Sequence, residues 1–278
     1  MNSSFAARLN AAIQTHSPLC VGIDPSASLL KKCGLPDSAE GALAFGKRVL
    51  EATEFKISII KPQSAFFERF GSAGFKAMEE LSSLARSRGM LVLLDGKRGD
   101  IDTTGAAYAE SYFGSSTSLQ VDAVTTHAYL GIGALQPFFD IALRANAGVF
   151  IVVRSSNPEG RELQLAKLGS GQTVAQHLAH EITVRNRAQG AGVGSFGAVV
   201  GATCDDAAEI VAELPQSFIL APGVGAQGAT MRDIAVRMPN AKGRVLANVS
   251  RAILANGSTA QDIRSTVRAL QDEARQLL

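Results

Sequence analysis

The sequence has few cysteines that could stabilise a fold through disulfide bonds or metal ions. It has three cysteines, Cys20, Cys33 and Cys204, which lie far apart and form no Cys-x-x-Cys pair. An odd and scattered set argues against a disulfide framework or a zinc site and fits a reducing compartment. We therefore expect a cytoplasmic protein that needs neither disulfides nor a metal to hold its core.

Long apolar runs and an excess of one charge are also missing. Residues 1–18 contain no extended apolar stretch, so they predict neither a signal peptide nor a membrane-spanning helix. A short amphipathic helix is expected there, with an organellar transit peptide as a lesser alternative. The net charge is only +2, without a block of Lys or Arg, which makes nucleic acids and anionic membranes poor candidates for partners.

No Pro- or Ser-rich linker and no shift in composition divides the chain. Hydrophobic residues make up 46% of it and charged residues 19%, as in ordinary globular proteins. The 278 residues could form two domains of ~150 residues, but α/β barrels of roughly 250 residues fold as one. We expect a single domain over residues 1–278.

Short apolar runs rich in Val, Ile and Leu recur along the chain and are bounded by Gly, Pro or Asp. Such runs are typical of strands that are buried on both faces. The predicted strands are Leu19–Ile23, Phe55–Ile60, Met90–Leu94, Val121–Thr125, Gly148–Val153, Phe196–Val200, Ser217–Leu220 and Arg244–Val249. Apolar spacings of three and four between them predict the helices Ala39–Thr53, Gln63–Arg88, Thr103–Phe113, Gly133–Ala145, Gly171–Gln189, Asp205–Glu213, Thr230–Met238 and Thr259–Leu278.

This alternation of strands and helices predicts a (β/α)8 TIM barrel of parallel strands, with an open doubly wound sheet as the alternative. The Gly- and Ala-rich stretch Asn186–Ser195 predicts a loop. Active sites of barrels lie at the carboxyl ends of the strands. The candidate residues are therefore the polar ones directly after each run: Asp24, Lys61, Asp95, Lys97, His127, Ser155, Ser156, Thr203, Pro222 through Gln227, Ser250 and Arg251.

The densest group of charges follows the third predicted strand, in Asp95-Gly-Lys97-Arg-Gly-Asp100-Ile101. Asp95 and Lys97 are two residues apart, so in an extended strand both side chains point to the same side. Lys61 ends the neighbouring second strand. Adjacent carboxylates favour a charged ammonium, and a held ammonium suits a general acid that protonates a carbanion. A turn with a surface ion pair is the plainer alternative.

A glycine-rich segment, Pro222-Gly-Val-Gly-Ala-Gln227-Gly, follows the seventh predicted strand. It matches G-x-G-x-x-G, but the next strand carries no acidic residue, so a dinucleotide site is not predicted. The loops after strands seven and eight commonly bind phosphate in barrels, and Ser250-Arg251 adds a guanidinium there. Alternatively, the glycines only make turns and Arg251 is solvated.

Two further strand-end residues have two interpretations each. Asp24 could accept hydrogen bonds from sugar hydroxyls or cap the next helix. Ser156 could bind a heterocyclic base or belong to a turn.

Several of these segments together resemble the orotidine 5′-phosphate decarboxylases, in the longer bacterial branch of that family. The resemblance spans nearly the whole chain and rests on Val-Gly-Ile-Asp24-Pro, Ile-Lys61-Pro-Gln, Asp95-Gly-Lys97-Arg-Gly-Asp100-Ile101, Ser-Asn-Pro-Glu-Gly, Pro222-Gly-Val-Gly-Ala-Gln227-Gly and Ser250-Arg251. It implies a reaction without metal or cofactor, in which orotidine 5′-monophosphate loses CO2 and becomes uridine 5′-monophosphate.

The resemblance also implies roles for single residues. A charged tetrad would consist of Lys61, Asp95, Lys97 and Asp100, with Lys97 as the proton donor to C6. Substrate binding would fall to Asp24 and Lys61 at the ribose, Ser156 (or Ser155) at the pyrimidine, Pro222 and Gln227 in the closing loop, and Ser250 and Arg251 at the phosphate. Asp100, Ile101 and Thr104 would reach into the partner's site in a homodimer with shared sites.

One departure from the family pattern stands next to the tetrad. This chain has Asp102-Thr103-Thr104 where many relatives have Pro-Asn-Thr, which keeps Thr104 but changes the entry into the next helix. Two other functions compete with the decarboxylase. A Mg²⁺-dependent sugar-phosphate decarboxylase or aldolase of the same superfamily would carry a carboxylate where Lys61 stands, and a non-catalytic nucleotide-binding barrel would need no tetrad.

Overall fold

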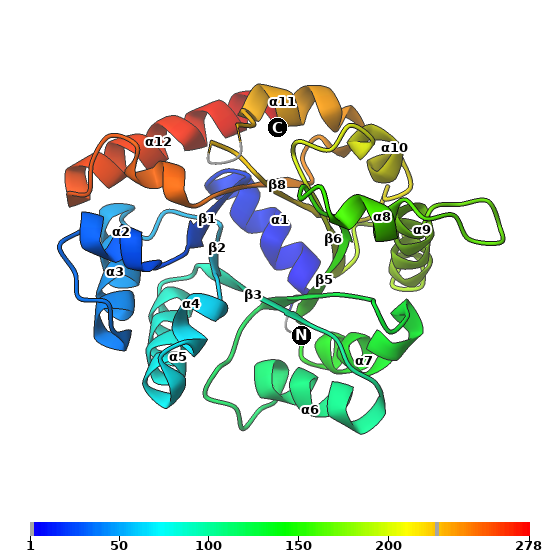
Figure 1. The fold of residues 1–278 in the computed structure, drawn as a ribbon, viewed down its shortest axis with the longest axis horizontal. Coiled ribbons are helices and arrows are strands. Elements are labelled where there is room, and N and C mark those ends of the chain that lie inside the picture. Colours follow the sequence, from blue (N-terminus) through cyan, green and yellow to red (C-terminus); the bar gives the residue numbers. More distant parts are fainter. Residues whose placement is uncertain (1–2, 226–227) are drawn as a thin grey trace.

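The computed structural model describes residues 3–225 and 228–278 and contains a closed barrel of parallel strands (Figure 1). Each strand pairs with the next one in the sequence, and β8 pairs with β1 to close the barrel. The predicted (β/α)8 fold is confirmed, and the open sheet is excluded. The strands are β1 (Leu19–Ile23), β2 (Ile59–Pro62), β3 (Leu91–Arg98), β4 (Ala123–Thr126), β5 (Gly148–Arg154), β6 (Phe196–Val200), β7 (Ile219–Pro222) and β8 (Val245–Val249).

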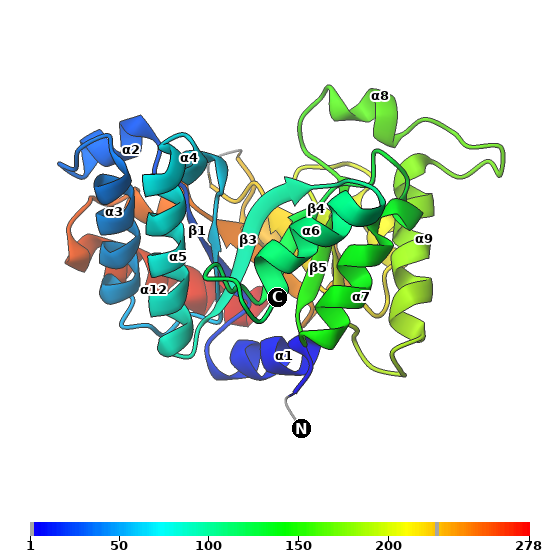
Figure 2. The ribbon, with the colours of Figure 1, turned by 90° about the horizontal axis from the view of Figure 1, so that it is seen from below.

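Helices surround the strands on the outside, as Figures 1 and 2 show. Their apolar faces cover the outer surface of the barrel, and residues of both form one large apolar core. The longer helices are α3 (Ala39–Ala52), α5 (Gly71–Ser87), α6 (Asp102–Phe113), α7 (Gln136–Arg144), α9 (Val174–Arg187) and α12 (Ala260–Leu277). The shorter ones are α2 (Ala27–Lys32), α4 (Ala65–Glu68), α8 (Gly160–Gln164), α10 (Ala207–Ala212) and α11 (Met231–Arg237), with 3-10 turns η1 (Ile132–Leu135), η2 (Pro239–Ala241) and η3 (Arg251–Leu254).

Helix α1 (Phe5–Thr15) lies across the end of the barrel at which the strands begin (Figure 2). The Ser4 side chain caps it by accepting a hydrogen bond from the Ala7 amide. Phe5 packs edge-to-face against Phe150 of β5, with ring centroids 6.0 Å apart, within the apolar cluster that fills this end. The opposite end, where the strands stop, is therefore the one that is open to a ligand.

None of the helices in the described part of the chain is long and apolar enough to cross a bilayer.

Several predicted boundaries were wrong for reasons of backbone conformation. The second strand begins at Ile59 and not at Phe55, because Glu54 and Phe55 form a turn with φ of +53° and +56°. The predicted helix Gln63–Arg88 is divided into α4 and α5, because Gly71 has φ of +60°, which a continuous helix does not allow.

Other differences concern short elements that carry little periodicity. The sequence did not indicate α2 or α8, which have only six and five residues. The predicted loop Asn186–Ser195 starts too early, because Asn186 belongs to the last turn of α9 and is fully buried. Its side-chain amide donates hydrogen bonds to the carbonyl groups of Phe196 and Gln216, which ties α9 to the start of β6.

Candidate active site

A cavity of about 320 Å³ lies at the carboxyl ends of the strands. The family resemblance gave roles to twelve residues, and eight of them line this cavity: Asp24, Lys61, Asp95, Lys97, Ser156, Pro222, Ser250 and Arg251. They come from the ends of β1, β2, β3, β5, β7 and β8 and from the loops that follow. The strand ends thus bring together residues that are more than 200 positions apart in the sequence.

A chain of alternating charges forms one wall of this cavity. The Lys61 Nζ atom lies 2.8 Å from Asp95 Oδ2, and Lys97 Nζ lies 2.5 Å from Asp95 Oδ1. Asp24 Oδ1 is 4.0 Å from Lys61 Nζ on the other side. Lys61 and Asp95 are buried, whereas 48% of the Lys97 side chain is exposed toward the cavity. Lys97 is thus the most exposed member of the group and is accessible both to a ligand and to solvent.

Lys61 and Asp95 hold each other in the ionised form. Burial disfavours charge on Lys61, but the carboxylates of Asp95 and Asp24 outweigh burial and raise the pKa of Lys61 above its ordinary value. Burial likewise works against ionised Asp95, yet Lys61 and Lys97 keep the pKa of Asp95 well below its usual range. Asp95 is therefore a permanent carboxylate that fixes two ammonium groups.

The backbone of β3 brings Asp95 and Lys97 together differently from the expected alternation. Lys97 has φ of +45°, and the pairing of β3 with β4 shifts register between Leu94 and Arg98. Thr125 on β4 holds both residues: its hydroxyl donates to Asp95 Oδ1 at 2.8 Å and accepts from the Lys97 amide at 3.0 Å. The sequence did not reveal Thr125, because its role depends on the register between two strands.

The cavity also contains buried polar atoms without a hydrogen-bond partner among the described residues. They are Asp24 Oδ1, Asn248 Oδ1 and Ser250 Oγ. Buried polar atoms are costly unless they are bonded, so unpaired ones around a cavity are positions for the polar groups of a ligand. Asn248 is another residue that the sequence did not single out, although it is two positions before Ser250 on β8.

The predicted phosphate end follows β7 and β8. Gly223 and Gly225 have φ of +118° and +73°, so the turn after Pro222 uses the conformational freedom of glycine. Arg251, which is exposed, begins the turn η3 and lines the cavity from the β8 side. Gln227 lies outside the described residues.

Residues 17–266 match the sequence profile of the orotidine 5′-phosphate decarboxylase / HUMPS family. The chain belongs to this family. Proteins named orotidine 5′-phosphate decarboxylase from Salinispora arenicola and Streptomyces coelicolor are 46% and 43% identical to it. The alignments cover 97% and 98% of this chain and 96% and 97% of the two relatives, respectively.

Solved structures of the family have the same fold. The protein from Streptomyces avermitilis assigned to this activity superposes with a TM-score of 0.93 at 41% identity, over 99% of this chain and 96% of that one. The Leishmania donovani OMP decarboxylase superposes with a TM-score of 0.81 at 31% identity, over 99% of this chain and 98% of that one.

Three residues of the family motif lie outside this cavity: Asp100, Ile101 and Thr104. Asp100 Oδ1 accepts a hydrogen bond from the Ile101 amide at 2.8 Å, and 49% of Ile101 is exposed. Helix α6 begins at Asp102 with φ of +46°, a value that proline cannot adopt. A proline at position 102, as in the family pattern, would therefore require a different backbone conformation at the start of this helix. Within one chain, three members of the predicted tetrad lie together, namely Lys61, Asp95 and Lys97, and Asp100 lies apart from them.

The Ser155 hydroxyl, after β5, is bonded within its own loop. Ser155 Oγ is 2.6 Å from Asn157 Oδ1 and accepts a hydrogen bond from Gln164 Nε2 at 2.8 Å. These contacts commit the Ser155 hydroxyl to the loop itself. Ser155 and Ser156 both line the cavity, and Ser156 stays the predicted contact to the pyrimidine.

Neither a metal cluster nor an activated thiol is found at the site. In residues 3–225 and 228–278, no three His, Cys, Asp or Glu side chains gather as metal ligands. Cys20 of β1 lies beneath the charged wall, and burial raises the pKa of its thiol to about 12. A thiol that stays protonated is not a nucleophile.

Proposed function

We propose that this protein decarboxylates orotidine 5′-monophosphate to uridine 5′-monophosphate and CO2, with neither metal nor organic cofactor. The observation that carries the proposal is the half-exposed Lys97 ammonium, which Asp95 holds at 2.5 Å at the edge of the cavity. Relatives with the decarboxylase name that are 40–46% identical over nearly the whole chain support the same activity.

The cavity suggests how the substrate is oriented. The 5′-phosphate would bind at Arg251 and the amide groups of the turn after Pro222, because guanidinium groups and glycine-rich turns bind phosphate. The ribose hydroxyls would donate hydrogen bonds to Asp24 and receive one from Lys61. The pyrimidine would contact Ser156, which leaves its C6 atom next to Lys97.

In the chemical step, the bond between C6 and the carboxylate carbon breaks, and its electron pair stays on C6. The Lys97 ammonium stabilises this developing carbanion through its charge and then donates a proton to C6. Because 48% of the Lys97 side chain is exposed, the lysine can take up a new proton from water after CO2 leaves. Asp95 keeps both ammonium groups in place during the step.

Binding of the remote phosphate would contribute to the rate of the chemical step. The phosphate does not react, so its binding energy is available to favour closure of the Gln227 loop over the substrate. We propose that Gln227 closes the site in this way.

We also infer that the protein acts in the cytoplasm as a homodimer in which Asp100, Ile101 and Thr104 complete the partner's site. Three observations support this: Asp100 does not line the cavity of its own chain, Ile101 is 49% exposed, and Tyr129 in the loop after β4 is 75% exposed. The buried free cysteines fit a reducing compartment. Mixing inactive Lys97→Ala and Asp100→Ala subunits should restore part of the activity. No recovery after verified subunit exchange would contradict shared sites.

The main rival is a Mg²⁺-dependent sugar-phosphate enzyme. Against it stands the Lys61 ammonium, which lies between Asp24 and Asp95 and repels a divalent cation from these carboxylates. The deciding experiment follows the absorbance of orotidine 5′-monophosphate after addition of purified protein, with and without EDTA. We expect rapid conversion that EDTA does not affect. No conversion by a folded sample, or loss of activity with EDTA, would contradict the proposal.

A further inference from the structure

Strand β5 ends in an arginine that is almost completely buried. Arg154 is only 2% exposed and is the largest fully buried side chain among the described residues. A buried guanidinium needs partners for its charge and its donors, since burial without them is costly. The Arg154 Nε donates to both carboxylate oxygens of Asp206, at 3.1 and 3.0 Å. Asp206 lies just before α10, so this ion pair connects two strand-end loops.

The same guanidinium fixes the loop that forms one wall of the active-site cavity. Arg154 Nη1 donates to the Ser155 carbonyl at 2.8 Å and to Gln164 Oε1 at 3.2 Å. Gln164, on α8, also accepts from the Ser155 amide at 3.0 Å and donates to Ser155 Oγ at 2.8 Å. Both backbone groups and the hydroxyl of Ser155 are thus held by residues that do not line the cavity.

We propose that Arg154, Asp206 and Gln164 are positioning residues that set the place of the Ser155–Asn157 loop against the pyrimidine of the substrate. This inference rests on the proposed function, in which Ser156 contacts the base. Ser155, Ser156 and Asn157 line the cavity, whereas Arg154, Gln164 and Asp206 do not. The three positioning residues therefore act only through the loop. Their loss should weaken binding of the base and leave binding of the ribose phosphate unchanged.

The geometry explains why an arginine stands at this position. Its planar group donates in fixed directions to Asp206, to Gln164 and to the Ser155 carbonyl, which lie on different segments. A lysine has one charged atom and cannot hold three segments at these angles. When the network is loosened, the loop loses its place while the phosphate end of the cavity, built from the β7 and β8 loops, is unaffected.

The test compares two probes that differ only in the base region: uridine 5′-monophosphate and ribose 5-phosphate. Binding of both is measured by calorimetry for wild-type protein and for Gln164→Met, Gln164→Glu and Asp206→Asn. Asp205→Asn is the matched control, because Asp205 is 82% exposed and pairs with the surface residues Arg161 and Arg237. Turnover of orotidine 5′-monophosphate by wild-type protein is measured separately, so that failure of the proposed function is recognised independently.

We expect Gln164→Met and Asp206→Asn to weaken uridine 5′-monophosphate binding about tenfold, as expected for lost buried hydrogen bonds to charged groups, with ribose 5-phosphate binding unchanged. Gln164→Glu keeps the acceptor for Arg154 and the Ser155 amide, so it should remain close to wild type, as should Asp205→Asn. Equal weakening of both probes, or no effect on uridine 5′-monophosphate, would overturn the inference. Because Gln164 lies on the outer side of the loop, its variants remain informative even if Asp206→Asn does not fold.

Discussion

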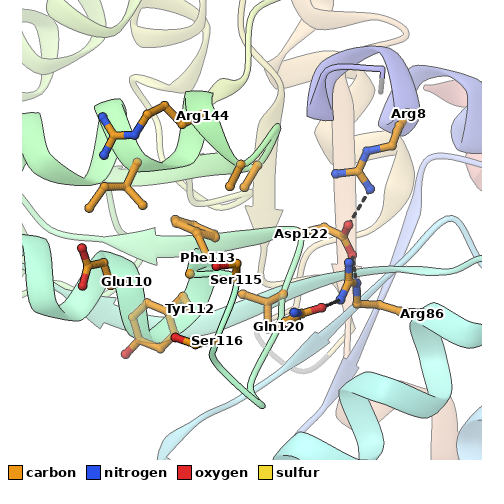
Figure 3. Close-up of a pocket in the computed structure, with 15 residues that line it drawn as sticks. Arg8, Arg86, Glu110, Tyr112, Phe113, Ser115, Ser116, Gln120, Asp122 and Arg144 are labelled. Atoms are coloured by element: carbon orange, nitrogen blue, oxygen red, sulfur yellow. Dashed lines mark hydrogen bonds and ion pairs between the residues drawn. The ribbon is translucent and has the colours of Figure 1, made fainter. Parts of the chain in front are cut away.

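The two ends of the barrel each bury a carboxylate between two cations, yet they serve different purposes. At the open end, Asp95 lies between Lys61 and Lys97. At the closed end, Asp122 lies between Arg8 and Arg86 (Figure 3). The Asp122 carboxylate is 3% exposed, with Arg8 Nη1 at 2.5 Å and Arg86 Nε at 3.5 Å.

Each of the three charged groups of this cluster has a further partner in the protein. Asp122 Oδ2 accepts from the Val92 amide, and Arg8 Nη2 donates to the Asn146 carbonyl. Arg86 Nη1 donates to the Gln120 side chain. The cluster therefore ties α1 and α5 to the beginnings of β3 and β4. The neighbouring cavity measures about 630 Å³, larger than the active-site cavity, so size alone does not identify the site.

The open end differs in its cations and in what is left unpaired. Its two cations are lysines, and Lys97 lines the cavity, where Asp24 Oδ1, Asn248 Oδ1 and Ser250 Oγ have no hydrogen-bond partner among the described residues. The difference teaches that a buried ion cluster indicates function when it leaves an exposed charge and polar atoms without hydrogen bonds at the wall of a cavity. A cluster with all groups satisfied indicates stability.

The largest effects on kcat and on Tm are expected from removing one cation at each end, Lys97 at the open end and Arg86 at the closed end. Lys97→Ala should lower kcat at least ~10³-fold while the protein stays folded, because the proton donor is lost. Arg86→Ala should retain kcat and lower Tm. Steady-state kinetics and thermal unfolding of both variants give the comparison. Near wild-type turnover by Lys97→Ala would remove its role as proton donor.

The exposed arginines of the two cavities offer a second contrast. Arg251→Ala should raise KM about 50-fold, since charged hydrogen bonds to the phosphate are lost. Arg144→Ala, which changes an exposed arginine of the closed-end cavity, should leave KM unchanged. An unchanged KM in Arg251→Ala would exclude Arg251 from phosphate binding.

Neutralising the closed-end carboxylate tests its structural role. Asp122→Asn should lower the free energy of unfolding by about 2 kcal/mol, because two partly buried arginines lose their shared counter-charge. The activity per folded molecule should remain. Denaturant unfolding measures the first quantity and active-site titration the second. A loss of kcat without a loss of stability would contradict the division between the two ends.

The hydroxyl of Thr125 should contribute a smaller amount to kcat. Thr125→Val removes its contacts to Asp95 and to the Lys97 amide, and we expect kcat to fall about tenfold with little change in KM. Thr126→Val is the matched control, because the buried Thr126 hydroxyl has no partner among the described residues. Equal effects of the two substitutions would show that Thr125 has no special role.

The smallest expected effect is the pH dependence of stability. Asp95 has a lowered pKa, so its contribution is present above the unfolded-state pKa of about 3.9 and is lost as the pH falls further. Lys61 has a raised pKa, so its contribution is present below about 10.4 and is lost as the pH rises through its folded-state value. Below pH ~4, the Tm of Asp95→Asn should therefore fall less steeply than that of wild-type protein. Parallel curves would contradict this coupling.

Much of the site could be predicted from the sequence because barrel strands end at one face. Lys61, Asp95 and Arg251 were recognised simply as polar residues directly after apolar runs, and the cavity contains all three. Thr125 and Asn248 were not recognised. Each lies in or beside a strand, and its contribution depends on which residue of the neighbouring strand or loop it faces.

The sequence by itself determined the alternation of strands and helices and the chemistry available at the strand ends. Both depend on residues close together in the chain, whose apolar spacing and backbone preferences act locally. Only the tertiary structure decided the φ of +45° at Lys97, the pairing of Thr125 with Asp95, and the Arg154 network. It also decided that Asp122 lies between Arg8 and Arg86. These features depend on barrel closure and strand register, which bring distant residues into contact and which no local pattern records.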